Sequence, residues 1–154
     1  MRPRLVAGLL SLAILAGNSA CSEKSTPSTP NTPGPLDLTG RWNSALTFQG
    51  INSTMTWTLT QNNSAVTGPV LLALPSGTVL LNGTLQGTLS GTSLPYTITV
   101  APGAVPSQPS CAGQLAGNMT VSNGTPATMT GTLGVGSSSC TIQFPASNIT
   151  LTKQ

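Results

Sequence analysis

Apolar and small polar residues alternate along most of the chain from Gly40 onward, and this alternation constrains the fold more than any other feature. Around position 57, for example, Met55, Trp57 and Leu59 are separated by threonines. A period of two places successive side chains on opposite faces of an extended strand. Threonine suits the solvent-facing positions of such strands. The pattern therefore predicts an all-β domain, which we place at residues 38–154.

The alternation repeats about eight times with mostly short connections. The residues expected to share an inward face are Trp42, Ser44, Leu46 and Phe48; Met55, Trp57 and Leu59; Val66, Gly68, Val70, Leu72 and Leu74; Val79, Leu81, Leu85 and Leu89; Leu94, Tyr96, Ile98 and Val100; Leu115, Met119 and Val121; Met129, Leu133 and Val135; and, in the last strand, Ile142 and Phe144, then Ile149 and Leu151. The last set changes parity, which predicts a bulge or bend at Pro145.

One apolar face per strand implies a closed barrel or a two-sheet sandwich. Sequential hairpins suffice for an up-and-down barrel, and closure leaves no exposed strand edge. A Greek-key sandwich needs long crossovers, and residues 101–110 are the longest internal loop that the sequence offers. We therefore predict an up-and-down barrel of about eight antiparallel strands, with a β-sandwich as the alternative.

Glycines recur on the apolar side of the expected strands. Gly83, Gly87, Gly113, Gly117 and Gly131 all fall there. Glycine permits the strong coiling that small barrels need, but it also removes side-chain volume from the interior. Strand curvature and a ligand cavity are both compatible with this pattern.

Charge is almost absent from the domain. Between Leu38 and Gln154 only Arg41 and Lys153 are charged, and the chain has no histidine. General acid–base catalysis mostly uses histidine or carboxylates, and zinc and calcium sites need ligands of the same kinds. Nucleic-acid binding needs clustered lysine and arginine. We therefore expect a non-enzyme with no cofactor, no metal and no nucleic-acid partner.

The first 20 residues have the parts of an export signal. Arg2 and Arg4 precede an apolar run at 5–16, and small residues then lead to Cys21. As a helix the run would rise about 18 Å, which is short of the roughly 30 Å hydrocarbon core of a bilayer. We interpret residues 1–20 as a cleaved signal peptide. The proline-rich segment that follows, within 21–37, has too little apolar surface to fold and is expected to be an extended tether.

A signal that ends at a cysteine and leads into such a tether resembles the N-terminus of bacterial lipoproteins. Ala20 and Cys21 fit that family's motif, whereas Asn18 stands where the family usually has an aliphatic residue. The resemblance implies acylation of Cys21, as in palmitate-bearing lipoproteins, and anchoring in the cell envelope. Ser22 is typical of outer-membrane sorting, on the periplasmic face. Ordinary cleavage after Ala20, giving a secreted or periplasmic soluble protein, is the alternative.

The cysteine count agrees with this interpretation. The chain has three cysteines, Cys21, Cys111 and Cys140, and an odd thiol is unusual in an exported protein. If Cys21 is acylated, the other two form an even pair in an oxidising compartment. A Cys111–Cys140 disulfide would contribute about 3–4 kcal/mol in the chain-entropy model. Two buried free thiols are the alternative.

Gly40 and Trp42 stand at the entry to the first expected strand. A glycine followed two residues later by a tryptophan at this place resembles the lipocalin and avidin group of eight-stranded barrels. The resemblance implies that Trp42 plugs one end of the barrel, and that Lys153 loosely matches the basic residue that lipocalins pack beside the plug. Biotin binding is not expected, because only Trp57 remains after Trp42 and no acidic residue follows Asp37.

Two functions fit these observations. The first is a membrane-anchored, non-catalytic envelope lipoprotein whose β-domain has a structural or interaction role, with the membrane and an envelope protein as partners. The second is a lipocalin-like module for a small apolar ligand. Its candidate pocket residues are Met55, Trp57, Tyr96 and Met119, which would serve equally well as ordinary core.

The scarcity of charge yields a prediction for solution behaviour. Solubility must rest on hydroxyls and amides, and the strands lack the charged residues that usually discourage association. We predict a stability that is insensitive to salt, together with some self-association. Sedimentation at low and high ionic strength should give the same distribution of species, and a strong shift with salt would contradict the prediction.

Overall fold

The structure, a computed structural model, describes residues 35–48, 50–141 and 146–154. Some predictions therefore lie outside the described residues. They concern the signal peptide at 1–20, the lipidated Cys21, the tether up to residue 34, and the positions Ile142, Phe144 and Pro145.

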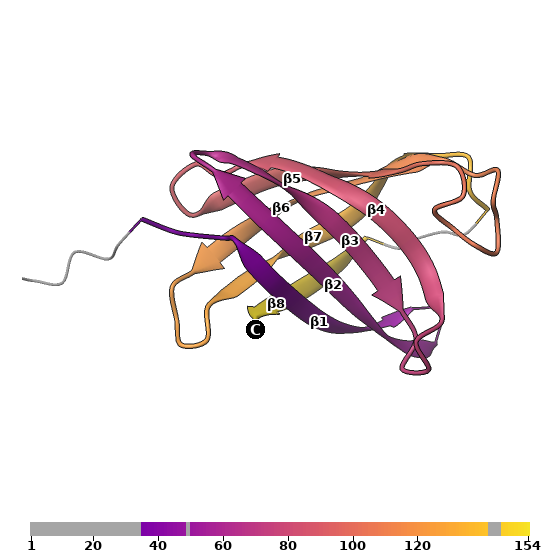
Figure 1. Cartoon of the computed structure of the whole chain (residues 1–154), viewed down its shortest axis with the longest axis horizontal. Helices are drawn as coiled ribbons and strands as arrows, with labels where there is room; N and C mark the ends of the chain where they lie inside the picture. The colour runs from indigo at the N-terminus through magenta and orange to yellow at the C-terminus, as the bar shows by residue number, and fades with distance from the viewer. Residues whose placement is uncertain (1–34, 49, 142–145) are drawn as a thin grey trace, which may run out of the picture. The chain divides into compact units, whose positions relative to one another are not determined.

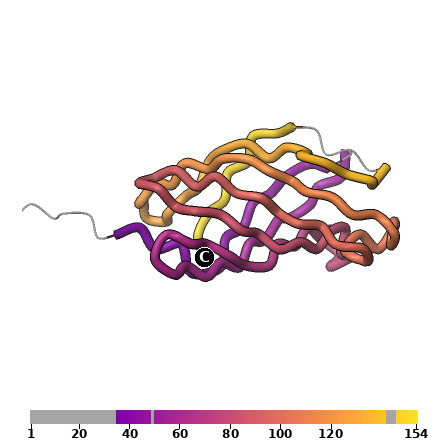
Figure 2. Tube along the Cα trace, turned by 90° about the horizontal axis from the view of Figure 1, so that it is seen from above, coloured from indigo at the N-terminus to yellow at the C-terminus, as the bar shows by residue number. Residues whose placement is uncertain are grey.

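The described residues form eight antiparallel strands in a closed up-and-down barrel, in which each strand pairs with the next and β8 pairs with β1 (Figure 1). The prediction of a barrel is confirmed, and the β-sandwich alternative is wrong. Seen from above, the strands wrap obliquely around a common interior (Figure 2). The strands are β1 (Gly40–Phe48), β2 (Ile51–Asn62), β3 (Ala65–Ala73), β4 (Val79–Thr88), β5 (Ser93–Val100), β6 (Gly113–Ser122), β7 (Thr128–Ser138) and β8 (Ser147–Lys153).

The inward face of the barrel is the apolar face that the sequence alternation indicates. In β2, Met55, Trp57 and Leu59 are buried. Thr54, which precedes Met55, and Thr58, which lies between Trp57 and Leu59, are exposed. Burial of each large side chain contributes roughly 1.5–3 kcal/mol. The largest fully buried side chains are Trp42, Trp57, Leu38, Met55, Leu59, Leu72, Leu81, Leu85, Leu94, Ile98, Met119 and Met129.

Val135 departs from the expected pattern. It has the inward parity of β7 together with the buried Met129 and Leu133, yet 37 % of its surface is exposed. The β6–β7 register shifts between Gln114 and Leu115, close to the point where Val135 pairs. Val135 lies near the end of β7, at the rim of the barrel, where an inward-facing side chain is still exposed to solvent. The alternation of residues does not indicate where this rim lies.

The inward glycines allow neighbouring strands to approach closely. A Cβ on Gly117 would overlap the carbonyl oxygen of Thr132, and one on Gly131 would overlap that of Asn118. At Gly83, Gly87 and Gly113 the nearest atoms of a neighbouring strand would lie 2.5–2.8 Å from a Cβ. Neighbouring atoms already occupy these Cβ positions, so the glycines allow the strands to approach closely and leave no empty side-chain space at these points.

Within the described strands, Pro69 of β3 and Pro95 of β5 each coincide with a break in the pairing of neighbouring strands. The β2–β3 pairing omits Thr58 and Leu59, which lie opposite Pro69 and its neighbour. The β4–β5 pairing ends at Gly87 and Tyr96, just before Pro95. Proline has no N–H to donate to a ladder. These breaks shape the outer wall of the barrel.

Different segments close the two ends of the barrel. At the N-terminal end, the segment 36–39 leads into β1 and places the buried Leu38 against the core. At the other end, which we call the disulfide end, the 101–112 connection folds over the barrel, and its Val105 is only 2 % exposed. Cys111 of this connection is disulfide-bonded to Cys140, as predicted, with a Cα–Cα distance of 4.8 Å.

A matched pair of glycine substitutions tests the close approach of the strands. Gly117→Ala should lower the free energy of unfolding by about 2–3 kcal/mol, because its methyl group has no room. Gly136→Ala should change it by less than about 0.5 kcal/mol, since the nearest atom to its Cβ position is 3.6 Å away. Urea unfolding measures both, and equal effects would contradict the argument.

Candidate functional site

Trp42 lies at the N-terminal end of the barrel and is completely buried. Its indole Nε1 donates a hydrogen bond of 2.8 Å to the carbonyl oxygen of Leu38. Leu38 is itself only 1 % exposed. This bond satisfies the polar atom of an otherwise apolar side chain, so the segment before β1 is drawn against the core.

Lys153, at the end of β8, lies over the same indole. Its Nζ is 5.6 Å from the centre of the Trp42 ring and donates a hydrogen bond of 2.8 Å to the carbonyl oxygen of Asp37. A cation–π contact of this kind contributes about 0.5–1 kcal/mol at an exposed site. The structure thus brings together the two residues that the sequence analysis named for this end.

Gln61 is a third member of this end that sequence reasoning missed. Its side chain accepts a 2.9 Å hydrogen bond from the Leu38 N–H and donates a 3.1 Å bond to the Leu36 carbonyl. Its own backbone N–H donates to Thr39 Oγ1. In the sequence Gln61 is one polar residue of a turn-like run, and nothing local indicates partners 22 to 25 residues away.

The Asp37 carboxylate at this end is exposed and oriented by its own turn. It accepts a 2.9 Å hydrogen bond from the Thr39 N–H. Hydrogen bonds from Thr39 hold the pKa of Asp37 below its ordinary value, because they favour the charged form. A bond from a side-chain oxygen to the N–H two residues later forms an Asx turn, which orients the chain just before β1.

The four candidate pocket residues are all buried in the barrel interior. Met55, Trp57 and Met119 have no exposed surface, and Tyr96 is 4 % exposed. The rings of Trp57 and Tyr96 meet edge to face, with centroids 5.0 Å apart. These side chains pack within one hydrophobic cluster. In the described part of the chain, Trp57 Nε1 has no hydrogen-bond acceptor.

Tyr96 spans one strand to reach another. Its hydroxyl donates a 2.9 Å hydrogen bond to the carbonyl oxygen of Thr132 on β7, passing Gly117 of the intervening β6. Burial raises the pKa of Tyr96 above its ordinary value, since the charged phenolate is poorly solvated there. The side chain is therefore a neutral structural link.

The disulfide end contains a small apolar pocket. It is lined by Leu81, Val100, Val105, Leu115 and Val135, with Cys140 and nearby polar residues beside them, and its volume is about 20 Å³. A cavity of this size holds about one water molecule. The 101–112 connection closes over it, held by a 2.7 Å hydrogen bond from the Asn82 N–H to the Ala104 carbonyl.

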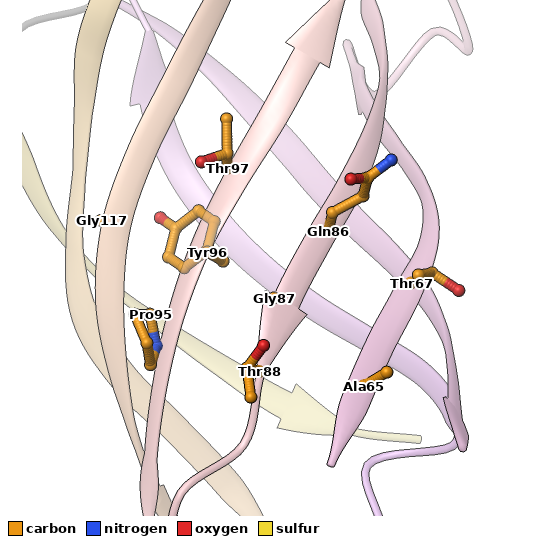
Figure 3. A pocket seen from close by; sticks show the side chains of 9 residues that line it. All are labelled: Ala65, Thr67, Gln86, Gly87, Thr88, Pro95, Tyr96, Thr97 and Gly117. Carbon is orange, nitrogen blue, oxygen red and sulfur yellow. The ribbon is translucent and has the colours of Figure 1, made fainter. Parts of the chain in front are cut away.

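A larger hollow lies on the outer wall over β3 to β6. We call it the outer trough, and it has a volume of about 600 Å³ (Figure 3). It occurs where the β4–β5 ladder stops short of Pro95. Its lining residues are Ala65, Thr67, Gln86, Gly87, Thr88, Pro95, Tyr96, Thr97 and Gly117.

Neither metal-ligand clusters nor spanning helices are found in the described ranges. Among these residues there is no group of three or more His, Cys, Asp or Glu side chains that could hold a metal ion. None of them forms a helix long and apolar enough to cross a membrane. Comparisons with protein-family models, curated proteins and solved structures give no match to this chain.

The burial of Tyr96 predicts a loss of stability at high pH. Tyr96 is the only tyrosine, and its pKa is raised in the folded state from an ordinary value of 10.0. Tyr96 ionises at a lower pH in the unfolded chain than in the folded protein. The free energy of unfolding is therefore highest below about pH 10 and declines as the pH rises toward the pKa of Tyr96 in the folded protein. The free energy of unfolding should fall by up to about 1.4 kcal/mol per pH unit in this window.

Urea unfolding at several values between about pH 8 and pH 11 measures this slope. Tyr96→Phe is the control, because it keeps the ring and removes the ionising hydroxyl. The variant should be less stable at neutral pH, since the bond to Thr132 is lost, but its stability should decline less above pH 10. The same decline in both proteins would show that another group is responsible.

Proposed function

We propose that the chain is a membrane-anchored, non-catalytic envelope lipoprotein whose barrel is a structural or interaction module. The observation that carries the proposal is the filling of the barrel. Trp42, Met55, Trp57, Tyr96 and Met119 occupy the interior with little or no exposed surface. A barrel of eight strands either is filled by side chains or holds one small ligand, and a filled barrel acts through its outer surface.

The N-terminal end of the barrel supports the anchoring part of the proposal. Lys153, Gln61 and Trp42 hold residues 36–38 by side-chain hydrogen bonds. The chain that comes from Cys21 would therefore join the barrel at a fixed place. Acylation of Cys21 would supply the membrane contact, and Ser22 favours the periplasmic face of the outer membrane. The absence of histidine from the chain and of side-chain carboxylates after Asp37 supports a non-catalytic role.

A second candidate function is a lipocalin-like module for a small apolar ligand. The contact of Lys153 with the Trp42 ring favours it, because the resemblance noted at Gly40 and Trp42 implies such a pair. The pocket of about 20 Å³ at the disulfide end weighs against it, since a ligand larger than water would need the interior side chains to move. We rank it second for that reason.

A native mass spectrum of the protein extracted from its own host in mild detergent tests both functions. The first predicts the mass of residues 21–154 plus acyl groups, with no further adduct. A matched Cys21→Ser variant should lack the acyl mass and leave the membrane fraction. An unacylated wild-type product that is fully soluble would overturn the anchor. A small-molecule adduct that is lost on denaturation would favour the second candidate.

A further inference from the structure

The rim of the outer trough presents a line of uncharged polar groups. Thr67 of β3, Gln86 of β4 and Thr97 of β5 are direct neighbours in register across the three strands, and Figure 3 shows all three around the hollow. Adjacent strands lie about 4.8 Å apart, so the line is about 10 Å long. The opposite rim is made by Ala65, Thr88 and Pro95.

The floor of the trough is mainly backbone, because the one large side chain between its rims, Tyr96, is only 4 % exposed. Gly87, Tyr96 and Gly117 are consecutive partners across β4, β5 and β6, and their inward parity leaves no side chain projecting outward between the two rims. A Cβ on Gly87 would lie 2.8 Å from the Pro95 carbonyl. Tyr96 is held by the Trp57 ring and by the hydrogen bond to Thr132. These contacts fix the position of Tyr96 beneath the hollow.

The chemistry of the lining selects a neutral, hydroxyl-rich ligand. Hydroxyl and amide groups both donate and accept hydrogen bonds. No charged side chain belongs to the described lining, so an ionic ligand would find hydrogen-bond partners but no opposite charge to offset its lost hydration. The Pro95 ring and the glycine floor offer apolar contact between the polar rims. A pyranose ring has this combination of hydroxyl groups around an apolar C–H face.

We propose that the outer trough binds a neutral carbohydrate, namely one or more pyranose rings of an uncharged glycan. The inference rests on the interaction role proposed above and gives it a class of partner. The two remain separable in experiment. An acylated mature protein that binds no glycan would overturn the trough proposal alone, whereas glycan binding by an unanchored protein would overturn the anchor alone.

The test is a titration of the isotope-labelled mature chain, in a detergent without a sugar headgroup, followed by backbone amide chemical shifts. The probes are two neutral oligosaccharides, cellohexaose and chitohexaose, with hexagalacturonate as their charged counterpart. At least one neutral probe should shift the amides of Gln86, Thr97 and their neighbours, and the charged probe should bind at least tenfold more weakly.

A pair of glutamine variants locates the site. Gln86→Ala should weaken binding about fivefold to tenfold, the effect of losing one hydrogen-bonding side chain. Gln114→Ala is the matched control, because Gln114 is also exposed and outward-facing but lies outside the trough. It should leave the affinity unchanged.

Several results would overturn the proposal. One is the absence of any shift with both neutral probes. A second is binding of the charged probe with the same affinity as the neutral probes. A third is a set of amide shifts that spread over the outer threonines without concentrating at the trough. A fourth is an equal loss of affinity in the two glutamine variants. Binding of an uncharged extended peptide at the same residues, with no response to either glycan, would assign the trough to protein recognition instead.

Discussion

The close approach of strand backbones at the inward glycines is the constraint on which the rest of the structure depends. Glycines at inward positions let the strands of a small barrel coil tightly. Because these glycines have no side chain, a large side chain on a neighbouring strand occupies the interior beside them. Tyr96 lies between Gly87 and Gly117 in register and extends past Gly117 to β7. Curvature and interior filling are thus two results of one arrangement.

This arrangement also explains why the outer wall is not smooth. The regular β4–β5 pairing ends at Gly87 and Tyr96, just before Pro95, and the outer wall is hollowed there. The interior, by contrast, is occupied by tryptophan, tyrosine and methionine side chains. The polar groups that could contact a partner therefore lie on the outer surface of the barrel.

Much of the fold could be predicted from the sequence, because a period of two is a local signal. The alternation in β2 and β5 identified buried residues correctly, and the even pair of cysteines identified the disulfide. The rim position of Val135 could not be predicted, since it depends on a register shift in a neighbouring strand. The partners of Gln61 and the Tyr96–Thr132 bond join residues far apart in sequence. Only the closed barrel brings such partners together.

The meeting of β1 and β8 has a consequence for how the chain could be rearranged. The Gln154 N–H donates to the Arg41 carbonyl, and Lys153 pairs directly with Trp42. The start and finish of the barrel are therefore neighbours in space, as Figure 1 shows at the C-terminal label. A short linker between them, with new ends opened in the turn between β2 and β3, would give a circular permutant that keeps every strand pairing. The order in which the strands are connected is thus not fixed by the architecture of the barrel.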